Sequence, residues 1–130
     1  MKKDIDFPKV EDVYLTVVKG DDDLWQVYML NRNINMLENV MVTSKGYGRK
    51  NGKEQKTSVL RHMIPKLQSG EFALIEPIDP GVFHLNNEYW VSFFIGNQLY
   101  DKKYIFVPDS IVEENLIHIA ELGKKGVLHQ

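Results

Sequence analysis

Short runs of β-branched and aromatic residues recur along the chain, separated by polar stretches that contain Gly, Pro, Asn or Asp. Within several runs apolar and polar side chains alternate, which is the period-two pattern of a strand with one buried face. No amphipathic helical pattern separates the runs, so the chain is expected to fold as an all-β protein. The pattern predicts seven strands, at residues 13–18, 25–30, 37–44, 57–63, 72–78, 89–95 and 99–107.

Turn-forming sequences lie between these runs. Asp79-Pro80-Gly81 combines a proline that presets φ with a glycine that tolerates positive φ. Gly96-Asn97 lies between two apolar runs and predicts a two-residue hairpin. These turns are short, so the strands on either side of them are expected to be neighbours in space.

The segment after the seventh run has a mixed pattern. Ser110 followed three residues later by Glu113 resembles a helix capping box, whereas Ile117 and Ile119 alternate as in a strand. We therefore expect residues 109–130 to form a tail that consists of a short helical turn and then an extended segment.

Seven strands need two layers, because each sheet has to bury one apolar face. We expect one domain over residues 1–130, an immunoglobulin-like antiparallel sandwich of two sheets with its core at about residues 10–108. The alternation assigns these side chains to the core: Trp25, Val27, Met29, Val40, Val42, Tyr89, Val91, Phe93 and Ile95.

Composition narrows the classes of function. The chain has 130 residues, a formal net charge of −2 and no cysteine, so disulfides, thiolate metal sites and a cysteine nucleophile are excluded. The net charge provides no overall attraction to nucleic acid or to an anionic membrane. No apolar run approaches the roughly 20 residues that span a bilayer, and acids stand where a signal peptide needs an apolar core. A cytoplasmic protein without membrane association is expected.

Two resemblances follow from particular residues. Over about residues 25–100 the chain resembles bacterial immunoglobulin-like sandwich domains of the adhesion or extracytoplasmic type. Such a likeness implies a fold and not an activity. The residues that carry it are Asn31, Leu37, Asn39, Val40, Val42, Gly70 and Glu71.

The whole chain also resembles a small family of uncharacterised bacterial proteins, some of which are labelled phenylalanyl-tRNA synthetase alpha subunit. A class II synthetase closes its ATP site with a G-x-G-x-E-R sequence. The nearest match here is Gly46 to Asn51, where Lys50 stands in place of the Glu and Asn51 in place of the Arg. The chain is also far too short for an aminoacylation domain, so the residues do not support that activity.

The stretch from Ser44 to Ser58 contains three glycines and five basic residues. Its glycine spacing fits neither the P-loop nor the dinucleotide-binding pattern, and both patterns need a helix to follow, whereas a strand is expected here. We interpret the stretch as a solvated loop between strands, turned by Asn51-Gly52. The alternative is that it contacts a polyanion such as nucleic acid, through Lys45, Tyr47, Arg49, Lys50, Lys53 and Lys56.

Trp90 and Phe94 lie on the face of their predicted strand opposite Tyr89, Val91, Phe93 and Ile95. If the latter four face the core, two large aromatic side chains lie on the outer surface, unless the C-terminal tail folds over them. An exposed pair of this kind marks a surface for a protein partner or for self-association.

No residue set matches a catalytic motif. The four histidines lack metal-ligand spacing and no serine has a G-x-S-x-G context. We expect no catalytic, cofactor-binding or metal-binding residues, and no cofactor. The sequence favours a non-catalytic protein-interaction or assembly module whose partner is unknown. A nucleic-acid-binding protein that uses residues 45–56 is the first alternative, and a small enzyme that uses His62 or His84 is the second.

Overall fold

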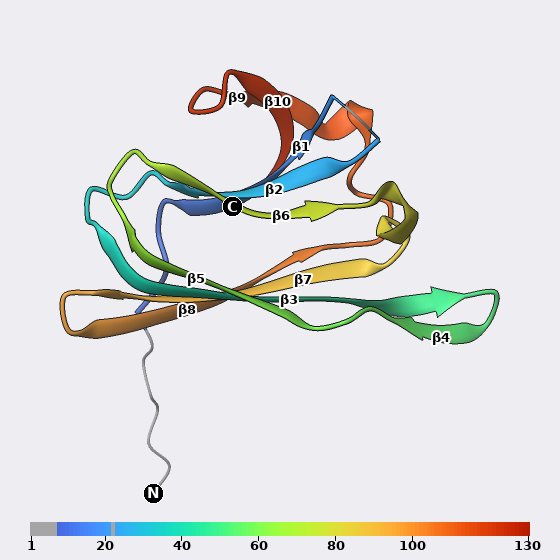
Figure 1. Cartoon of the computed structure of the whole chain (residues 1–130), viewed down its shortest axis with the longest axis horizontal. Helices are drawn as coiled ribbons and strands as arrows, with labels where there is room; N and C mark the ends of the chain where they lie inside the picture. The colour runs from blue at the N-terminus through green and yellow to red at the C-terminus, as the bar shows by residue number, and fades with distance from the viewer. Residues whose placement is uncertain (1–7, 22) are drawn as a thin grey trace, which may run out of the picture.

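The computed structural model describes residues 8–21 and 23–130. Two antiparallel sheets of five strands each face one another, which confirms the predicted all-β sandwich (Figure 1). Sheet A has the order β6-β2-β1-β10-β9, with β1 (Val13–Lys19), β2 (Trp25–Asn31), β6 (Phe72–Ile78), β9 (Leu116–Ile119) and β10 (Lys124–His129). Sheet B has the order β4-β3-β7-β8, and β5 also pairs with β3; its strands are β3 (Leu37–Lys50), β4 (Lys53–Lys56), β5 (Leu60–Leu67), β7 (Asn86–Ile95) and β8 (Gln98–Phe106).

The core lies between the two sheets and contains the side chains that the alternation assigned to it. Eight of the nine predicted side chains are buried, and Ile95 is half-buried and packs against the same cluster. Tyr104 on β8 is also buried, and its hydroxyl donates to the carbonyl of Val13 on β1, a bond from one sheet to the other. Because apolar burial is the main favourable contribution to folding, this cluster accounts for most of the stability of the sandwich.

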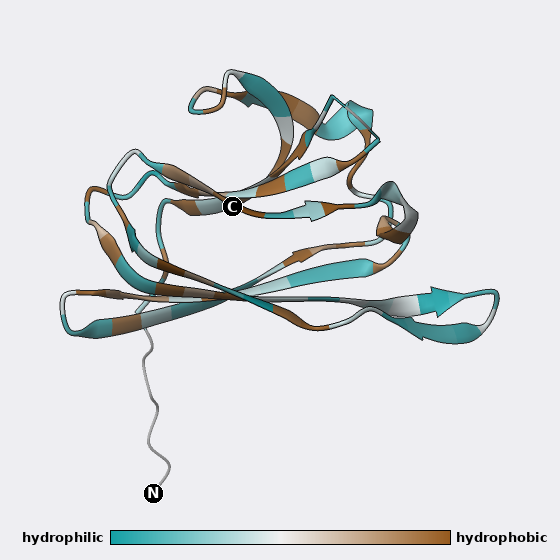
Figure 2. Cartoon of the chain, viewed as in Figure 1, coloured by the Kyte–Doolittle hydropathy of each residue, from teal (hydrophilic) through white to brown (hydrophobic). Residues whose placement is uncertain are grey.

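β3 exchanges partners halfway along its length. Its first part, Leu37–Ser44, pairs with β5, and its second part, Tyr47–Lys50, pairs with β4. The second part and β4 form a hairpin that extends past the end of the sandwich (Figure 1) and is largely hydrophilic (Figure 2). We call residues 45–56 the arm. The expected loop is therefore a strand pair, and only Asn51 and Gly52, both with positive φ, form the predicted turn.

Gly46 lies at the point where β3 changes partners. Its N–H donates to the Thr57 hydroxyl at 2.7 Å, and its carbonyl accepts from the Thr57 N–H at 2.9 Å. A Cβ atom at Gly46 would lie 2.9 Å from Cγ2 of Thr57. The glycine is thus required by close packing of two chain segments and not by a phosphate group.

The C-terminal segment is part of sheet A. A single 3-10 turn at Glu113–Asn115 precedes β9, so the predicted order of a short helical turn followed by an extended segment is confirmed. The prediction of a capping box at Ser110 is wrong. Val112 is the residue that precedes the turn, and the Ser110 hydroxyl donates to the carbonyl of Val107 instead. β10 was not predicted, and it pairs with β1 in the middle of the sheet.

Side chains connect the two sheets along both sides of the sandwich. On one side, Glu76 of β6 binds residues of sheet B. On the other, the N–H of Ile105 on β8 donates to Nε2 of His129 on β10 at 3.3 Å. In the described part of the chain no helix is long and apolar enough to cross a membrane.

Candidate functional site: the outer face of sheet B and the arm

Trp90 lies on the outer face of β7 and is 47% exposed. Thr43 of β3 and Lys103 of β8 lie opposite it on the neighbouring strands, and Nζ of Lys103 is 4.9 Å from the centre of its indole ring. β9 and β10 belong to the other sheet and leave the indole uncovered. The predicted outward position of Trp90 is therefore confirmed, and its cation–π contact holds the ring in place.

Other apolar side chains surround Trp90 on this face. Met41 of β3 and Met63 of β5 are opposite one another and exposed, and Leu99 of β8 is exposed beside Phe94. Phe94 itself is half-buried, so it is less available than the sequence suggested. Flexible methionines beside an aromatic ring form an adaptable apolar surface. We call this group the outer patch: Met41, Met63, Trp90, Phe94 and Leu99.

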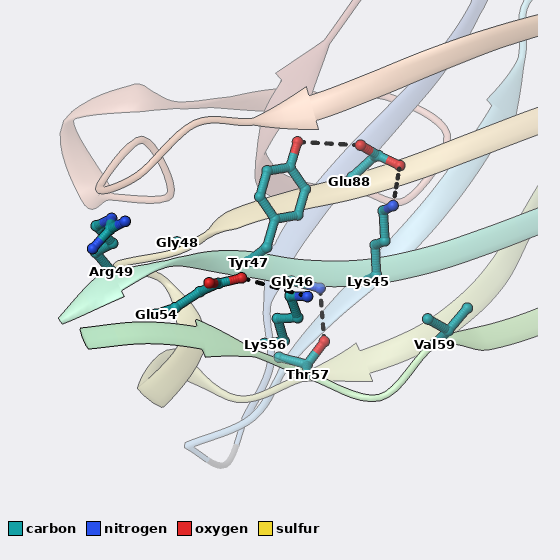
Figure 3. A pocket seen from close by; sticks show the side chains of 10 residues that line it. All are labelled: Lys45, Gly46, Tyr47, Gly48, Arg49, Glu54, Lys56, Thr57, Val59 and Glu88. Atoms are coloured by element: carbon teal, nitrogen blue, oxygen red, sulfur yellow. Dashed lines mark hydrogen bonds and ion pairs between the residues drawn. The ribbon is translucent and has the colours of Figure 1, made fainter.

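Glu88 connects the outer patch with the arm. Its side chain is only 7% exposed and accepts a hydrogen bond from the Tyr47 hydroxyl at 3.2 Å. Nζ of Lys45 lies 3.7 Å from the same carboxylate (Figure 3). Nζ of Lys103 lies 4.0 Å from it. A buried carboxylate needs such partners, because desolvation without them is costly. Burial and the bond to Glu88 raise the pKa of Tyr47, so its hydroxyl stays protonated as a donor.

No pattern in the sequence indicates the role of Glu88. Alternation along β7 places it on the outer face with Trp90, where an acid is expected to be solvated. Its three partners come from β3 and β8, and only the register of those strands brings them over it. The two candidate surfaces predicted separately from sequence are thus one continuous surface.

The structure separates the six predicted polyanion-contacting residues into two groups. A hollow of 730 Å³ at the base of the arm is lined by both acidic and basic side chains, and its lining includes Lys45, Tyr47, Arg49 and Lys56 (Figure 3). Lys50 and Lys53 are opposite one another next to the turn, on the other face of the hairpin. Glu54 and Glu88 also line the hollow, so its lining has an excess of one positive charge.

The arm and the remainder of the chain have opposite charges. The arm contains five basic residues and one acidic residue, a formal charge of +4. Since the whole chain has −2, the residues outside the arm carry −6. The molecule is therefore polarised, with its positive charge on a projecting element.

A second polar cluster lies between the sheets, around Glu76. Its Oε1 accepts from the Ser44 hydroxyl at 2.8 Å and from Nε2 of His62 at 2.7 Å, and its Oε2 accepts from the Tyr89 hydroxyl at 3.1 Å. Burial, followed by the charge of Glu76 and the bond to it, raises the pKa of Tyr89. The cluster joins β3, β5 and β7 of sheet B to β6 of sheet A.

This cluster bears on the alternative of a small enzyme. His62 does meet a carboxylate, but Glu76 lies between Ser44 and His62, whereas a serine nucleophile needs the imidazole between itself and the acid. His84 lies apart and bonds Oε1 of Gln55 at 2.7 Å. Within the described residues, no group of three or more His, Cys, Asp or Glu side chains could hold a metal ion.

No protein-family model, no curated protein and no solved structure matches the chain. The fold therefore defines the class, an all-β two-sheet sandwich, and the function has to be argued from the surfaces described above.

Proposed function

We propose that the protein is a non-catalytic protein-interaction module whose working surface runs from the outer patch to the arm. The observation that carries this proposal is Trp90, a large aromatic side chain left 47% exposed and held in place by Lys103. Tryptophan is among the residues most enriched where protein interfaces concentrate their binding energy. The surrounding apolar side chains and the polar arm resemble the core and the rim of such an interface.

The charge on this surface indicates the chemistry of the partner. The arm carries +4, and Lys45 and Lys103 together exceed the charge of Glu88 by one. Arg61 is opposite Thr43, in the same cross-strand row as Trp90. We therefore infer a protein partner that presents an acidic surface with an apolar side chain for Trp90, because complementary charge favours association and orients it.

The immunoglobulin-like assignment belongs to this proposal. In immunoglobulin domains, strands A, B and E share one sheet and strands C, F and G the other. Here β1, β2 and β6 are adjacent in sheet A, and β3, β7 and β8 are adjacent in sheet B, which is the same order along the chain. Sandwiches of this type often bind other proteins, and the absence of cysteine agrees with a cytoplasmic location.

The test is affinity capture from native extract followed by reconstitution with the purified partner. Trp90→Ser is expected to weaken the reconstituted complex by at least about tenfold, as loss of a hot-spot side chain does, while the melting temperature stays near that of the wild type. Phe72→Ser is the matched control, because Phe72 is an aromatic residue 45% exposed on sheet A. Wild-type affinity for Trp90→Ser, or loss of affinity in Phe72→Ser alone, would refute the proposed surface.

A second function, binding of single-stranded nucleic acid, is favoured by one observation. Tyr47 lines the hollow together with Lys45, Arg49 and Lys56, the combination of a stacking ring with cations that such proteins use. Arg49→Ala should then weaken binding of an oligonucleotide more than Lys50→Ala does, because Lys50 points from the opposite face. Absence of binding at low salt, where electrostatic binding is strongest, would exclude this function.

A further inference from the structure

β8 is the last strand of sheet B on the side away from the arm (Figure 1). Every other edge strand has a feature that protects an edge against pairing. β5 and β6 contain Pro65 and Pro77, β9 has four residues, and β4 consists of charged and polar residues. β8 spans nine residues without a proline, and among the described residues no backbone group bonds it from the side away from β7.

Alternate residues of β8 direct their backbone N–H and C=O groups toward this open edge. The N–H of Ile105 does so, since it bonds His129 and not β7. The alternation of an antiparallel ladder assigns the same direction to every second residue before it. The side chains of these residues lie on the outer face of the sheet, because Tyr104 between them is buried. We call them the edge residues: Leu99, Asp101, Lys103 and Ile105.

The sequence of this edge is self-complementary. It reads LYDKKYI from Leu99 to Ile105, with Lys102 at its centre. When two copies pair in antiparallel fashion with Lys102 on the two-fold axis, Asp101 of each copy lies opposite Lys103 of the other. Leu99 then lies opposite Ile105 of the other copy. This register joins edge residues only to edge residues, as antiparallel hydrogen bonding requires.

Lysines on an edge strand commonly prevent pairing, but both lysines of β8 fit this arrangement. Lys103 faces an aspartate of the other copy, and opposite charges across two strands stabilise their pairing. Nζ of Lys102 lies 4.8 Å from the centre of the Tyr104 ring of its own chain. Because the two strands run in opposite directions, the two Lys102 side chains lean away from one another.

We propose that two copies of this chain associate through β8 and form one continuous sheet across the pair. A contact that each copy makes with the same surface closes after two copies, so it produces a dimer and not a filament. Leu99 belongs to the outer patch, so the dimer places two outer patches side by side. The dimer itself does not require that a partner protein binds the outer patch.

The first experiment is sedimentation velocity at roughly 5 to 500 µM protein, the range that suits a small interface. The wild type should increase in mass from 15.1 kDa toward twice that value. Asp101→Lys and Lys103→Asp should each weaken the dimer by at least about tenfold, since each creates two pairs of like charges. An equimolar mixture of the two variants should associate again, because each supplies the charge that the other lacks. Glu114→Lys, the same change of charge at an exposed position outside β8, is the control and should dimerise like the wild type.

A second experiment tests the register. The chain has no cysteine, so Lys102→Cys introduces its only thiol. On the two-fold axis the two Cα atoms would be about 4.5 Å apart, within the range of a disulfide, and oxidation should link the copies. Gln98→Cys is the control, since position 98 lies opposite Phe106 of the other copy and should not cross-link.

If Lys103→Asp fails to fold, Asp101→Lys and the cross-link decide. A wild type that stays monomeric at the highest concentration would overturn the proposal. So would an unchanged dimer in Asp101→Lys, a mixture of the two folded variants that stays monomeric, an equal loss in Glu114→Lys, or equal cross-linking of Gln98→Cys.

Discussion

The presence of glycine at position 46 is explained by the packing of Gly46 against Thr57. In sequence, Gly46 and Gly48 belong to a glycine-rich basic stretch whose composition suggests phosphate binding although its glycine spacing does not fit. In the structure their Cα atoms pass close to Thr57 and to Leu85, respectively, and both glycines permit β3 to continue into the arm. The basic side chains lie before Gly46, between Gly48 and Gly52, and on β4.

At this scale we predict that Gly46→Ala lowers the free energy of unfolding by about 1–3 kcal/mol, the usual cost of overpacking. The new Cβ atom would lie 2.9 Å from Cγ2 of Thr57. Gly48→Ala is the control, since its Cβ atom would lie 3.2 Å from a methyl carbon of Leu85, a milder contact than the one at Gly46. Urea denaturation measures both, and equal effects of the two substitutions would contradict the packing argument.

At the scale of the element, the arm is a hairpin whose outer part is attached to the sandwich only through its base. Every residue of β4 is exposed, and Asn51 and Gly52 turn the chain with φ of 53° and 77°. Local unfolding of such an element costs less than global unfolding. The arm is therefore expected to open independently of the core.

Gly52→Val should accordingly act on the arm alone. A β-branched residue at positive φ is strained by about 1–3 kcal/mol, and we expect faster hydrogen exchange at the amides of β4 with no change in those of β1 or β7. Exchange monitored by NMR distinguishes the two regions. An equal loss of protection in the core would show that the arm and the sandwich unfold together.

The elements differ in how far the sequence could predict them. Strands with alternating large apolar residues, such as β2 and β7, were predicted because burial of one face of a strand makes every second residue apolar. β4 and the outer half of β3 were not, because the arm has no buried face and depends on hairpin pairing. β10 was not predicted either, since Lys124, Lys125 and Gly126 carry no apolar signal. Contacts such as Glu76 with His62 depend on strand register, which local patterns do not define.

At the scale of the whole molecule, the two sheets are joined on one side by His129. Burial lowers the pKa of its imidazole, and Nε2 has to be unprotonated to accept from Ile105. In the unfolded chain the imidazole of His129 has a pKa of about 6.5, which is higher than its pKa in the folded protein. The contribution of neutral His129 to the free energy of unfolding is therefore complete above pH 6.5 and is lost as the pH falls through the folded-state pKa.

We predict that the free energy of unfolding, measured with urea at pH 7.5 and pH 5.5, decreases more steeply with acidification in the wild type than in His129→Phe. The variant keeps an aromatic ring beside Tyr104 and Phe106 but cannot be protonated. Other titrating groups contribute equally to both proteins, so the difference between the two slopes isolates His129. Parallel pH dependence would show that its protonation is not linked to folding.

The position of β10 has a consequence for the order of folding. β10 pairs with β1, so the middle of sheet A joins residues 15–18 to residues 126–129. During synthesis β1 leaves the ribosome early, and one of its edges has no partner until more than a hundred further residues have been added. Pairing over such a separation is slow. The nascent chain thus exposes an edge of β1 that chaperones or a second copy could occupy before β10 arrives.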